Sequence, residues 1–220
     1  MNDNEALTAY IQAHVESEPE WLAVLDRDAN VELMNARMNS GHLQGRLLKM
    51  LTKLIAPRQV LELGTFGGYS ALCIAEGLSG DATVTTVEID DEKEDFIRRH
   101  IEASPYASRI RLLIADAMEL LPDMTAESFD MIFLDSDKRD YPALYPLCKR
   151  LLAPGGLLIA DNVLWDGHIA DAAYDRDRQT VALRRFNEMV ATDAAVEAVI
   201  IPLRDGLSLI RKKNLLSDCC

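Results

Sequence analysis

From residue 58 onward, apolar runs of strand length alternate with segments of helical pattern. The strand-like runs are QVLEL (59–63), ATVTTVEI (82–89), RIRLLIA (109–115), DMIFLD (130–135), GGLLIAD (155–161), AVEAVIIPL (195–203) and GLSLIRK (206–212). The helical patterns occupy residues 69–79, 91–103, 139–152 and 177–192. Strands that alternate with helices indicate a largely parallel sheet with helices on both faces. The chain is therefore predicted to be an α/β protein with a doubly wound sheet.

The last two strand-like runs are separated by little more than Arg204, Asp205 and Gly206. Such a short Asp-Gly connection allows only a hairpin, so the C-terminal strand is predicted to be antiparallel to its neighbour. The first 55 residues have helical patterns instead. We expect a single domain over residues 1–220, in which a helical segment (1–55) precedes an α/β core (56–220).

Charge and composition argue against two classes of partner. The 220 residues carry a formal net charge of −13 at pH 7, which disfavours a nucleic-acid backbone and an anionic membrane surface. No apolar stretch approaches the roughly 18 residues of a membrane span, and the acidic start MNDNEALTAYIQAHVESE lacks the pattern of a secretion signal. The four cysteines form no disulfide framework, and Cys219 and Cys220 have no metal-ligand spacing. A reducing, cytoplasmic location is expected.

The first predicted strand leads into a glycine-rich loop, ELGTFGGYS (62–70). In doubly wound sheets the ligand binds outside the carboxyl ends of the strands, which is where this loop lies. Its glycines, at 64, 67 and 68, do not have the GxGxxG spacing of dinucleotide-binding proteins. Glu62 would repel a phosphate and attract a cation. The loop therefore favours a ligand without a pyrophosphate, although a plain strand-to-helix turn is the alternative.

Two further strand ends carry candidates for ligand binding. Glu88 ends the second strand, 24 residues after Gly64, near the position at which an acidic residue accepts hydrogen bonds from ribose hydroxyls. Its alternative role is a solvated helix cap. Asp116 and Ala117 follow the third strand, where they are suited either to hold an adenine edge or to begin a helix.

The tips of the fourth and fifth strands carry the most specific set. Asp135 follows one strand, and Asp161 with Asn162 follows the other. If these strands are neighbours, two carboxylates and an amide oxygen meet and form a site suited to Mg²⁺, Ca²⁺ or Mn²⁺. Lys138 lies three residues past Asp135, and a partly desolvated lysine beside a dication can act as a general base. Solvent-facing acids and a surface ion pair are the alternatives.

Tyr141 and Trp165 lie close in sequence to the two loops of the predicted metal site. They are suited to contact a flat aromatic substrate. A place in the core or at the rim is the alternative for both.

Residues 38–213 resemble the cation-dependent class I S-adenosylmethionine O-methyltransferases, which include catechol and caffeoyl-CoA O-methyltransferases and their small bacterial relatives. The matching stretches are MNSGHLQGRLL, VLELGTFGGYSAL, TVEID, FDMIFLDSDKRDYPALY, LLAPGGLLIADNVLWDGHIAD and LRDGLSLIRK. They span about four-fifths of the chain. The combination of DSDK with ADNVLW is specific to this group, whereas the glycine loop alone indicates only the broader methyltransferase fold.

The resemblance implies a Rossmann-like methyltransferase sheet and a role for each candidate. S-Adenosylmethionine would contact Met38, Ser40, Glu62, Gly64, Thr65, Gly68, Ser70, Glu88, Asp116, Ala117 and Asp135. The divalent cation would bind Asp135, Asp161 and Asn162, and Lys138 would be the catalytic base. Tyr141 and Trp165 would contact the acceptor, a small molecule with an aromatic hydroxyl group. The first 37 residues would form a substrate lid and part of a homodimer contact.

Two residues depart from the pattern of the family. Asp140 stands where relatives often have Asn, and Gly67 where they often have Thr. Neither change removes a group that the chemistry needs. A nicotinamide-dependent oxidoreductase is the alternative enzyme, but it requires GxGxxG and a hydride-transfer site. A binding module that has lost catalysis is the other alternative, but it predicts a broken metal set or a missing lysine.

Overall fold

The computed structural model describes residues 3–35 and 38–214, so Cys219 and Cys220 lie outside the described residues. The strands are β1 (Gln59–Leu63), β2 (Thr83–Glu88), β3 (Ile110–Ile114), β4 (Phe129–Leu134), β5 (Leu152–Ala160), β6 (Val196–Ile201) and β7 (Leu207–Lys212). The α-helices are α1 (Asp3–His14), α2 (Glu20–Glu32), α3 (Gly41–Ile55), α4 (Tyr69–Gly77), α5 (Glu94–Glu102), α6 (Ala117–Leu120), α7 (Tyr141–Leu151) and α8 (Arg178–Ala191). Short 3₁₀ helices are η2 (Asp91–Lys93), η3 (Ala107–Arg109), η4 (Leu121–Asp123), η5 (Lys138–Asp140), η6 (Trp165–Ala170) and η7 (Ala172–Tyr174).

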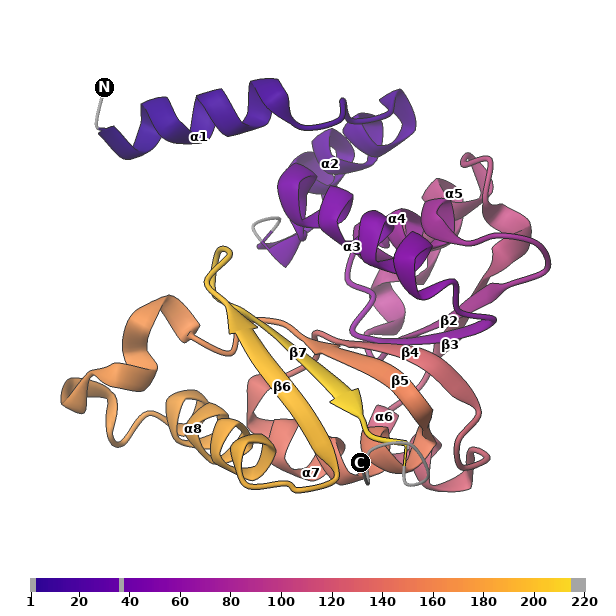
Figure 1. Cartoon of the computed structure of the whole chain (residues 1–220). Coiled ribbons are helices and arrows are strands. Elements are labelled where there is room, and N and C mark those ends of the chain that lie inside the picture. Colours follow the sequence, from indigo (N-terminus) through magenta and orange to yellow (C-terminus); the bar gives the residue numbers. More distant parts are fainter. Residues whose placement is uncertain (1–2, 36–37, 215–220) are drawn as a thin grey trace.

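All strands of the described residues belong to one seven-stranded sheet, in the order β3-β2-β1-β4-β5-β7-β6 (Figure 1). Strands β1 to β5 pair in parallel, and β7 is antiparallel to both β5 and β6. The predicted doubly wound sheet, the C-terminal hairpin and the neighbouring β4 and β5 are thereby confirmed. The hairpin turns through Arg204 and Gly206, whose φ angles are 50° and 88°.

Strand β5 differs from its predicted bounds, since it begins at Leu152 rather than at residue 155. The pairing of β4 with β5 shifts between Phe129 and Met131. A β-bulge of this kind absorbs extra residues and bends the strand. Pro154, Gly155 and Gly156 lie within this irregular part of the strand.

The helices cover both faces of the sheet, with α3, α4 and α5 on one side and α7 and α8 on the other (Figure 1). Alternation along β4 divides its side chains between the two layers. Met131 and Phe133 pack in the cluster that includes Leu48 of α3, whereas Ile132 and Leu134 pack in the cluster of α7 and α8. Two apolar layers therefore fix the sheet from both sides.

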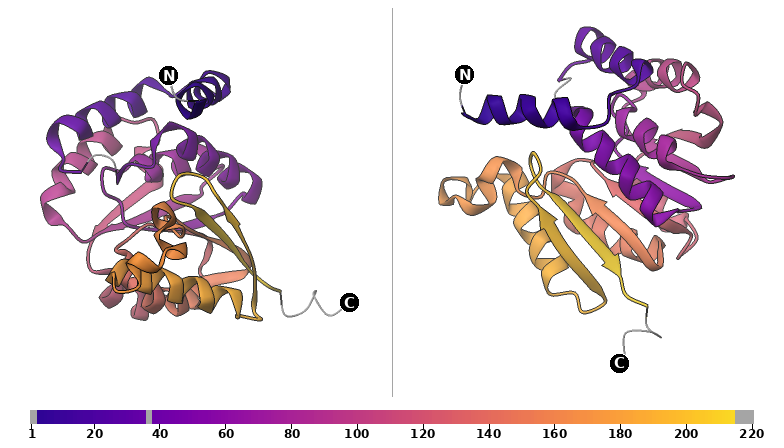
Figure 2. Two further views of the ribbon diagram at one scale, coloured as in Figure 1. Left: turned by 90° about the vertical axis from the view of Figure 1, so that its left-hand side faces the viewer. Right: turned by 45° about the horizontal axis from the view of Figure 1, so that its top comes forward.

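The N-terminal helices extend this architecture. Helix α2 packs Leu22 and Leu25 against α4, whereas α1 extends beyond the helices that cover the sheet (Figure 2). Between them, Glu16 forms an ion pair of 2.6 Å with Lys49, and Tyr69 donates a hydrogen bond to Glu18. The helical character predicted for residues 1–55 is confirmed for the described part of this segment. Among the described residues, no helix has the length and apolar character needed to cross a bilayer.

Candidate active site

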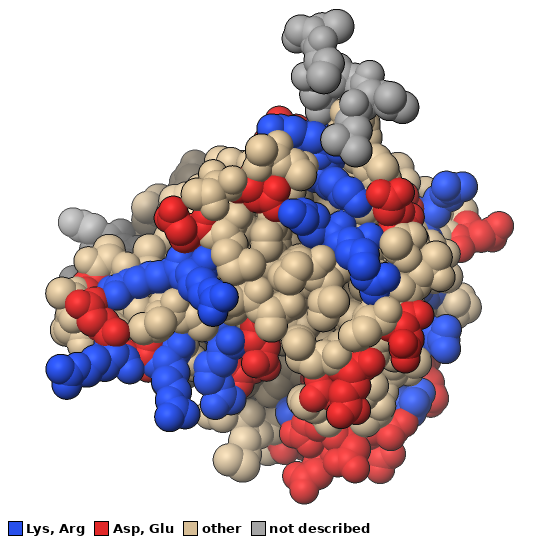
Figure 3. Space-filling view, turned by 90° about the horizontal axis from the view of Figure 1, so that it is seen from below, with Lys and Arg blue, Asp and Glu red and all other residues tan. Residues whose placement is uncertain are grey.

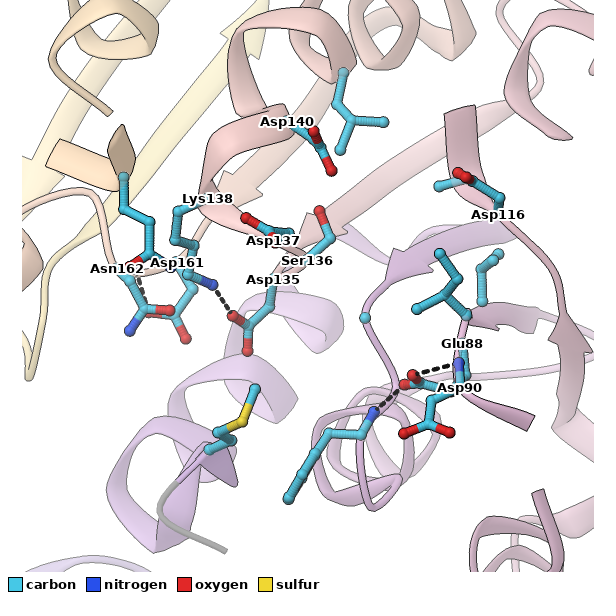
Figure 4. A pocket seen from close by; sticks show the side chains of 18 of the residues that line it. Glu88, Asp90, Asp116, Asp135, Ser136, Asp137, Lys138, Asp140, Asp161 and Asn162 are labelled. Carbon is cyan, nitrogen blue, oxygen red and sulfur yellow. Dashed lines mark hydrogen bonds and ion pairs between the residues drawn. The ribbon is translucent and has the colours of Figure 1, made fainter. Parts of the chain in front are cut away.

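A cavity of about 620 Å³ opens at the edge of the sheet where the parallel strands end (Figure 4). Residues at or just beyond the ends of five strands line it, among them Gly64, Glu88, Asp116, Asp135 and Asp161. This is the location at which doubly wound sheets bind ligands. The central strand β4 is mainly buried and apolar, whereas the polar residues at the ends of the parallel strands converge on the cavity.

Gly64 lies where two strand ends meet. Its φ angle is 97°, and an added Cβ atom would lie 2.1 Å from the carbonyl oxygen of Asp135. The Asp135 amide in turn donates to the carbonyl oxygen of Leu63 at 2.8 Å. Glycine is therefore required here because the loop after β4 passes directly against the loop after β1.

The loop after β4 carries a carboxylate and an amine that contact each other. Lys138 Nζ donates to Asp135 Oδ1 at 2.5 Å (Figure 4). Lys138 lies in η5, whose N-cap is Asp137, and is 7% exposed. Its stem is therefore enclosed while its amine lines the cavity. The alternative that Lys138 pairs with Asp137 or Asp140 is wrong.

The loop after β5 carries a second, more deeply buried carboxylate. Asp161 accepts a hydrogen bond of 2.5 Å from Gln44 Nε2 and one of 2.7 Å from the Asn162 amide. Burial raises the pKa of Asp161, and the nearby charge of Asp135 raises it further. The ionised forms of the two carboxylates therefore oppose each other, which is the situation that a cation relieves.

Asn162 adds an amide to this set. Its φ angle is 58°, a conformation that Asn tolerates better than most residues. Its Nδ2 donates to Asp205 Oδ2 at 3.3 Å, so the amide nitrogen is engaged by the β6–β7 hairpin. Two carboxylates and one amide oxygen fit a hard dication such as Mg²⁺. No third carboxylate, His or Cys among the described residues joins them in a metal-binding cluster.

The opposite end of the cavity is formed by β2 and the glycine loop. Glu88 accepts hydrogen bonds from the main-chain amides of Phe66 at 2.7 Å and Asp90 at 3.0 Å (Figure 4). Its side chain is largely buried but lines the cavity. Glu88 is thus fixed by main-chain donors from two loops, rather than being a solvated helix cap.

Glu62 lies beneath the glycine loop and does not line the cavity. Burial raises its pKa to about 8, and hydrogen bonds from Ser70 and Thr86 oppose that rise. The hydroxyl groups of Thr65 and Thr86 are joined by a hydrogen bond. Glu62 Oε1 has no hydrogen-bond partner among the described residues. Glu62, Thr65 and Ser70 therefore form a buried polar layer that supports the loop from below.

Other cofactor candidates occupy different places. Asp116 and Ala117 line the cavity, and the Asp116 carboxylate caps α6 by accepting from the Met118 amide at 2.7 Å. Met38 also lines the cavity and is 58% exposed. Ser40 is buried outside the lining.

Gly68 is likewise outside the lining and is the N-cap of α4, with a φ angle of 89°. Its backbone conformation, rather than contact with the cavity, accounts for the glycine. Of the residues predicted to hold the cofactor, some line the cavity, namely Met38, Gly64, Glu88, Asp116, Ala117 and Asp135. The others lie outside the lining, namely Ser40, Glu62, Thr65, Gly68 and Ser70.

The two aromatic candidates have different positions. Trp165 lines the cavity. Tyr141 does not, because it is fully buried and its hydroxyl group donates to the carbonyl oxygens of Leu134 and Asp161, at 3.0 Å each. The prediction that Tyr141 contacts the substrate is therefore corrected: its ring packs in the core and its hydroxyl group joins the ends of β4 and β5.

Among the residues of the site that were not predicted from the sequence, two make polar contacts that join distant parts of the chain. Gln44 is 1% exposed, and its position on α3 brings it to Asp161 across 117 residues of sequence. Arg204 lines the cavity and donates to the carbonyl oxygens of Asn39, at 2.9 Å, and Ser40. A polar residue on the apolar face of a helix was the only available signal for Gln44.

Comparisons with known proteins agree with this geometry. The model of the O-methyltransferase family matches residues 12–213. A catechol O-methyltransferase of Niastella koreensis is 33% identical over 174 residues, which cover 76% of this chain and 78% of that protein. A caffeoyl-CoA O-methyltransferase of Stellaria longipes is 30% identical over 184 residues, which cover 80% of this chain and 76% of that protein.

A solved structure shares the whole architecture. The crystal structure of the O-methyltransferase TomG from Streptomyces achromogenes, involved in tomaymycin synthesis and determined in complex with SAM, has a TM-score of 0.89 and 27% sequence identity. The match covers 97% of this chain and 100% of the Streptomyces chain. The Rossmann-like methyltransferase fold expected from the sequence is confirmed. The chain belongs to the O-methyltransferase family.

Proposed function

We propose that this protein transfers the methyl group of S-adenosylmethionine to one hydroxyl group of a vicinal dihydroxy aromatic compound, with a divalent cation at the acceptor. The observation that carries this proposal is the arrangement of Lys138, Asp135 and Asp161 at one end of a cavity whose other end presents Glu88. The cavity therefore brings a set of oxygen ligands and a candidate base to the space that a diol acceptor would occupy.

S-Adenosylmethionine is assigned to the ends of β1, β2 and β3. Glu88 is suited to accept hydrogen bonds from the two ribose hydroxyl groups, because its carboxylate is already oriented by main-chain donors. Asp116 and Ala117 are placed for the adenine ring. The crystal structure of the Streptomyces relative with SAM supports this cofactor. The glycine spacing, unsuited to a pyrophosphate, disfavours a nicotinamide-dependent oxidoreductase.

Asp135, Asp161 and Asn162 are the residues that would hold the cation. Mg²⁺ is the first candidate, and Ca²⁺ and Mn²⁺ are the others, since all three prefer oxygen ligands. A bound dication lowers the pKa of a coordinated hydroxyl group. The buried position of Asp161 and its closeness to a second carboxylate are the features of this chain that fit such an ion.

The chain's own residues contribute proton transfer and alignment. Lys138 Nζ receives the hydroxyl proton of the acceptor, and the resulting oxyanion attacks the methyl carbon while the C–S bond breaks. The products are a neutral aryl ether and a neutral thioether. Because charge disappears in this step, alignment of oxygen, carbon and sulfur is the main contribution of the protein. Trp165 lines the acceptor end and is suited to contact the aromatic ring.

The expected assembly is a homodimer in the cytoplasm, with a small-molecule acceptor and no nucleic-acid or membrane partner. The net charge of −13 supports the last two points. The extended α1 supports a contact between subunits (Figure 2). The division into a lid segment at 1–55 and a core at 56–220 also stays a prediction.

The decisive experiment is methyl transfer to a panel of small catechols, measured with Mg²⁺ and then with EDTA. We expect turnover that EDTA removes and added metal restores. Turnover that is insensitive to EDTA would reject the role of the cation and keep the methyltransferase. Calorimetric titration with S-adenosylmethionine separates an unsuitable acceptor panel from a failure to bind the cofactor. A chain that binds the cofactor but transfers no methyl group to any acceptor would favour a non-catalytic binding module.

A further inference from the structure

A second cavity, the arginine groove, lies beside α7 and α8 and is separate from the catalytic cavity. Its volume is about 530 Å³. It is lined by Arg139, Arg176, Arg178 and Arg185 together with Pro142, Ala143, Val181 and Ala182. None of the described residues that line it is acidic. On the face seen in Figure 3, several basic side chains lie close together at the lower left, and the largest group of acidic side chains lies at the lower right.

This groove contrasts with the overall charge of the protein, which is −13. The side chains of Arg176, Arg178 and Arg185 have no ion-pair or hydrogen-bond partner among the described residues. Arg139 is the exception, since it pairs with Asp137. Three guanidinium groups therefore face one groove with their donors unused.

The neighbouring acids Asp175 and Asp177 form no ion pair with these arginines, and their carboxylates have other partners. Asp175 forms an ion pair of 2.6 Å with Arg184. Asp177 caps α8 by accepting hydrogen bonds of 2.7 Å from the amide and the hydroxyl group of Thr180. Arg184 also donates to three main-chain carbonyl groups, which is the pattern of a structural arginine. The arginines of the groove lack such bonds.

The arginine groove shares a thin wall with the catalytic cavity. Lys138 lines the catalytic cavity, and the next residue, Arg139, lines the groove. In the same way Arg178 lines the groove, and the next residue, Gln179, lines the catalytic cavity. These two pairs belong to η5 and to the start of α8, which pack against each other. At two places, one residue step along the chain separates the cavities.

We propose that the arginine groove binds the phosphoryl group of a small molecule, as a phosphate or a diphosphate. A guanidinium group offers donors in a planar fork that matches phosphate oxygens, and it keeps its charge at any physiological pH. The apolar lining, including Val181 at 47% exposure, leaves room for an organic part of the same ligand. The phosphoryl group belongs either to the methyl acceptor itself or to a separate anion.

The first test measures binding without turnover. Inorganic pyrophosphate is titrated calorimetrically into the full chain in metal-free buffer, so that neither a cation nor the methyl-transfer reaction contributes. We expect saturable binding that weakens with added salt. The double variant Arg178→Gln/Arg185→Gln is expected to bind about 100-fold more weakly, from about tenfold for each lost charged hydrogen-bond donor.

The matched control is Arg211→Gln, an exposed arginine of β7 that pairs with Glu197. It is expected to bind pyrophosphate as the wild type does. Circular dichroism verifies that each variant is folded, which the exposed positions of Arg178 and Arg185 favour. Equal affinity in the wild type and the double variant overturns the proposal, and so does the absence of binding to the wild type.

The second test identifies the source of the phosphoryl group and rests on the proposed function. A dihydroxyphenyl acceptor is compared with the same acceptor carrying a phosphate ester. If the phosphoryl group belongs to the acceptor, pyrophosphate competes with the phosphorylated acceptor. In that case the double variant has a higher KM for the phosphorylated acceptor only, and its kcat is unchanged. For a separate anion, pyrophosphate leaves the KM of both acceptors unchanged. Failure of methyl transfer would leave the binding test intact, so the two proposals fail separately.

Discussion

The two ends of the catalytic cavity are built in different ways. At the cofactor end, the carboxylate of Glu88 is held by main-chain amides of Phe66 and Asp90. At the reaction end, Asp135 is held by the side chain of Lys138, and Asp161 by the side chain of Gln44 together with the main-chain amide of Asn162. Main-chain donors are fixed by the sheet and its loops, whereas side-chain donors can rotate away.

This difference has a functional meaning. A carboxylate with fixed donors is oriented before the ligand arrives, so binding costs little conformational entropy. A carboxylate whose partner is an amine or an amide side chain can exchange that partner for a ligand. We therefore predict that the cofactor end is organised for binding and that the reaction end is organised for a change of partners during turnover.

The substitution Lys138→Met should impair the reaction end of the cavity and leave the cofactor end intact. We expect kcat to fall about 10²- to 10⁴-fold, the usual contribution of a general base, while the dissociation constant of S-adenosylmethionine stays within about twofold. Steady-state kinetics and calorimetry measure the two quantities. Lys53→Met, an exposed lysine of α3, is the control. Full turnover in Lys138→Met would show that another group takes the proton.

Gly64→Ala should disrupt the contact between the loop after β1 and the loop after β4, which joins the two ends of the cavity. The new Cβ atom would lie 2.1 Å from the Asp135 carbonyl oxygen, and φ is already 97°. We expect the free energy of unfolding in urea to fall by about 3 kcal/mol or more. Gly80→Ala is the control, because Gly80 has a φ angle of 56° and no atom within 4 Å of the added carbon. That variant should lose about 1 kcal/mol, and equal losses would contradict the role of the junction.

Glu62, in the buried polar layer beneath the glycine loop, should make the stability of the protein depend on pH. Its pKa is about 8 in the folded protein against an ordinary value of 4.5, mainly because of burial. Folding therefore takes up a proton between these values, so the stability from this group is full below about pH 4.5 and falls as the pH rises toward 8. The loss is at most about 1.4 kcal/mol per pH unit.

Urea unfolding of the ligand-free protein from pH 5 to pH 8 measures this effect against Glu62→Gln, which cannot ionise. We expect the variant to gain stability relative to the wild type as the pH rises. Glu197→Gln, at an exposed ion pair, is the control and should follow the wild type. Parallel profiles for the wild type and Glu62→Gln would contradict the pKa shift.

The smallest effect is expected at the cofactor end itself, from Glu88→Gln. The amide can accept fewer hydrogen bonds from main-chain donors and ribose hydroxyl groups, so S-adenosylmethionine should bind about tenfold more weakly. At saturating cofactor, kcat should stay within about twofold of the wild type, because the reaction end is unchanged. Asp91→Asn, at a nearby exposed acid, is the control. A large loss of kcat would show that the two ends are not independent.

The site residues whose positions could be predicted from the sequence are those that the geometry of the sheet fixes. Once β4 and β5 are neighbours, Asp135 and Asp161 must end at the same edge, and Lys138 is carried with them. Glu88 and Asp116 follow from the same rule. Apolar runs fix the strands, and the ends of the strands then fix the positions of their polar residues.

The part that the sequence did not predict depends on side-chain direction and on distant contacts. Tyr141 is close to Lys138 in sequence, yet at the start of α7 its side chain turns into the core. Gln44 reaches Asp161 only because α3 lies against the sheet. The start of β5 was placed too late, because a bulge lets Pro154 and two glycines remain within the strand.

The last strand also has a consequence for how the protein is made. Strand β7 lies between β5 and β6, and its hairpin carries Arg204 to the carbonyl oxygen of Asn39, a contact between residues 165 positions apart. Contacts of such high sequence separation form late and slow the folding of a chain. During synthesis on the ribosome, the segment that leads into α3 has no Arg204 to hold it until the C-terminal hairpin has emerged. A nascent chain in which this hairpin has not formed therefore lacks the contacts of Arg204 with the carbonyl oxygens of Asn39 and Ser40, beside the cavity.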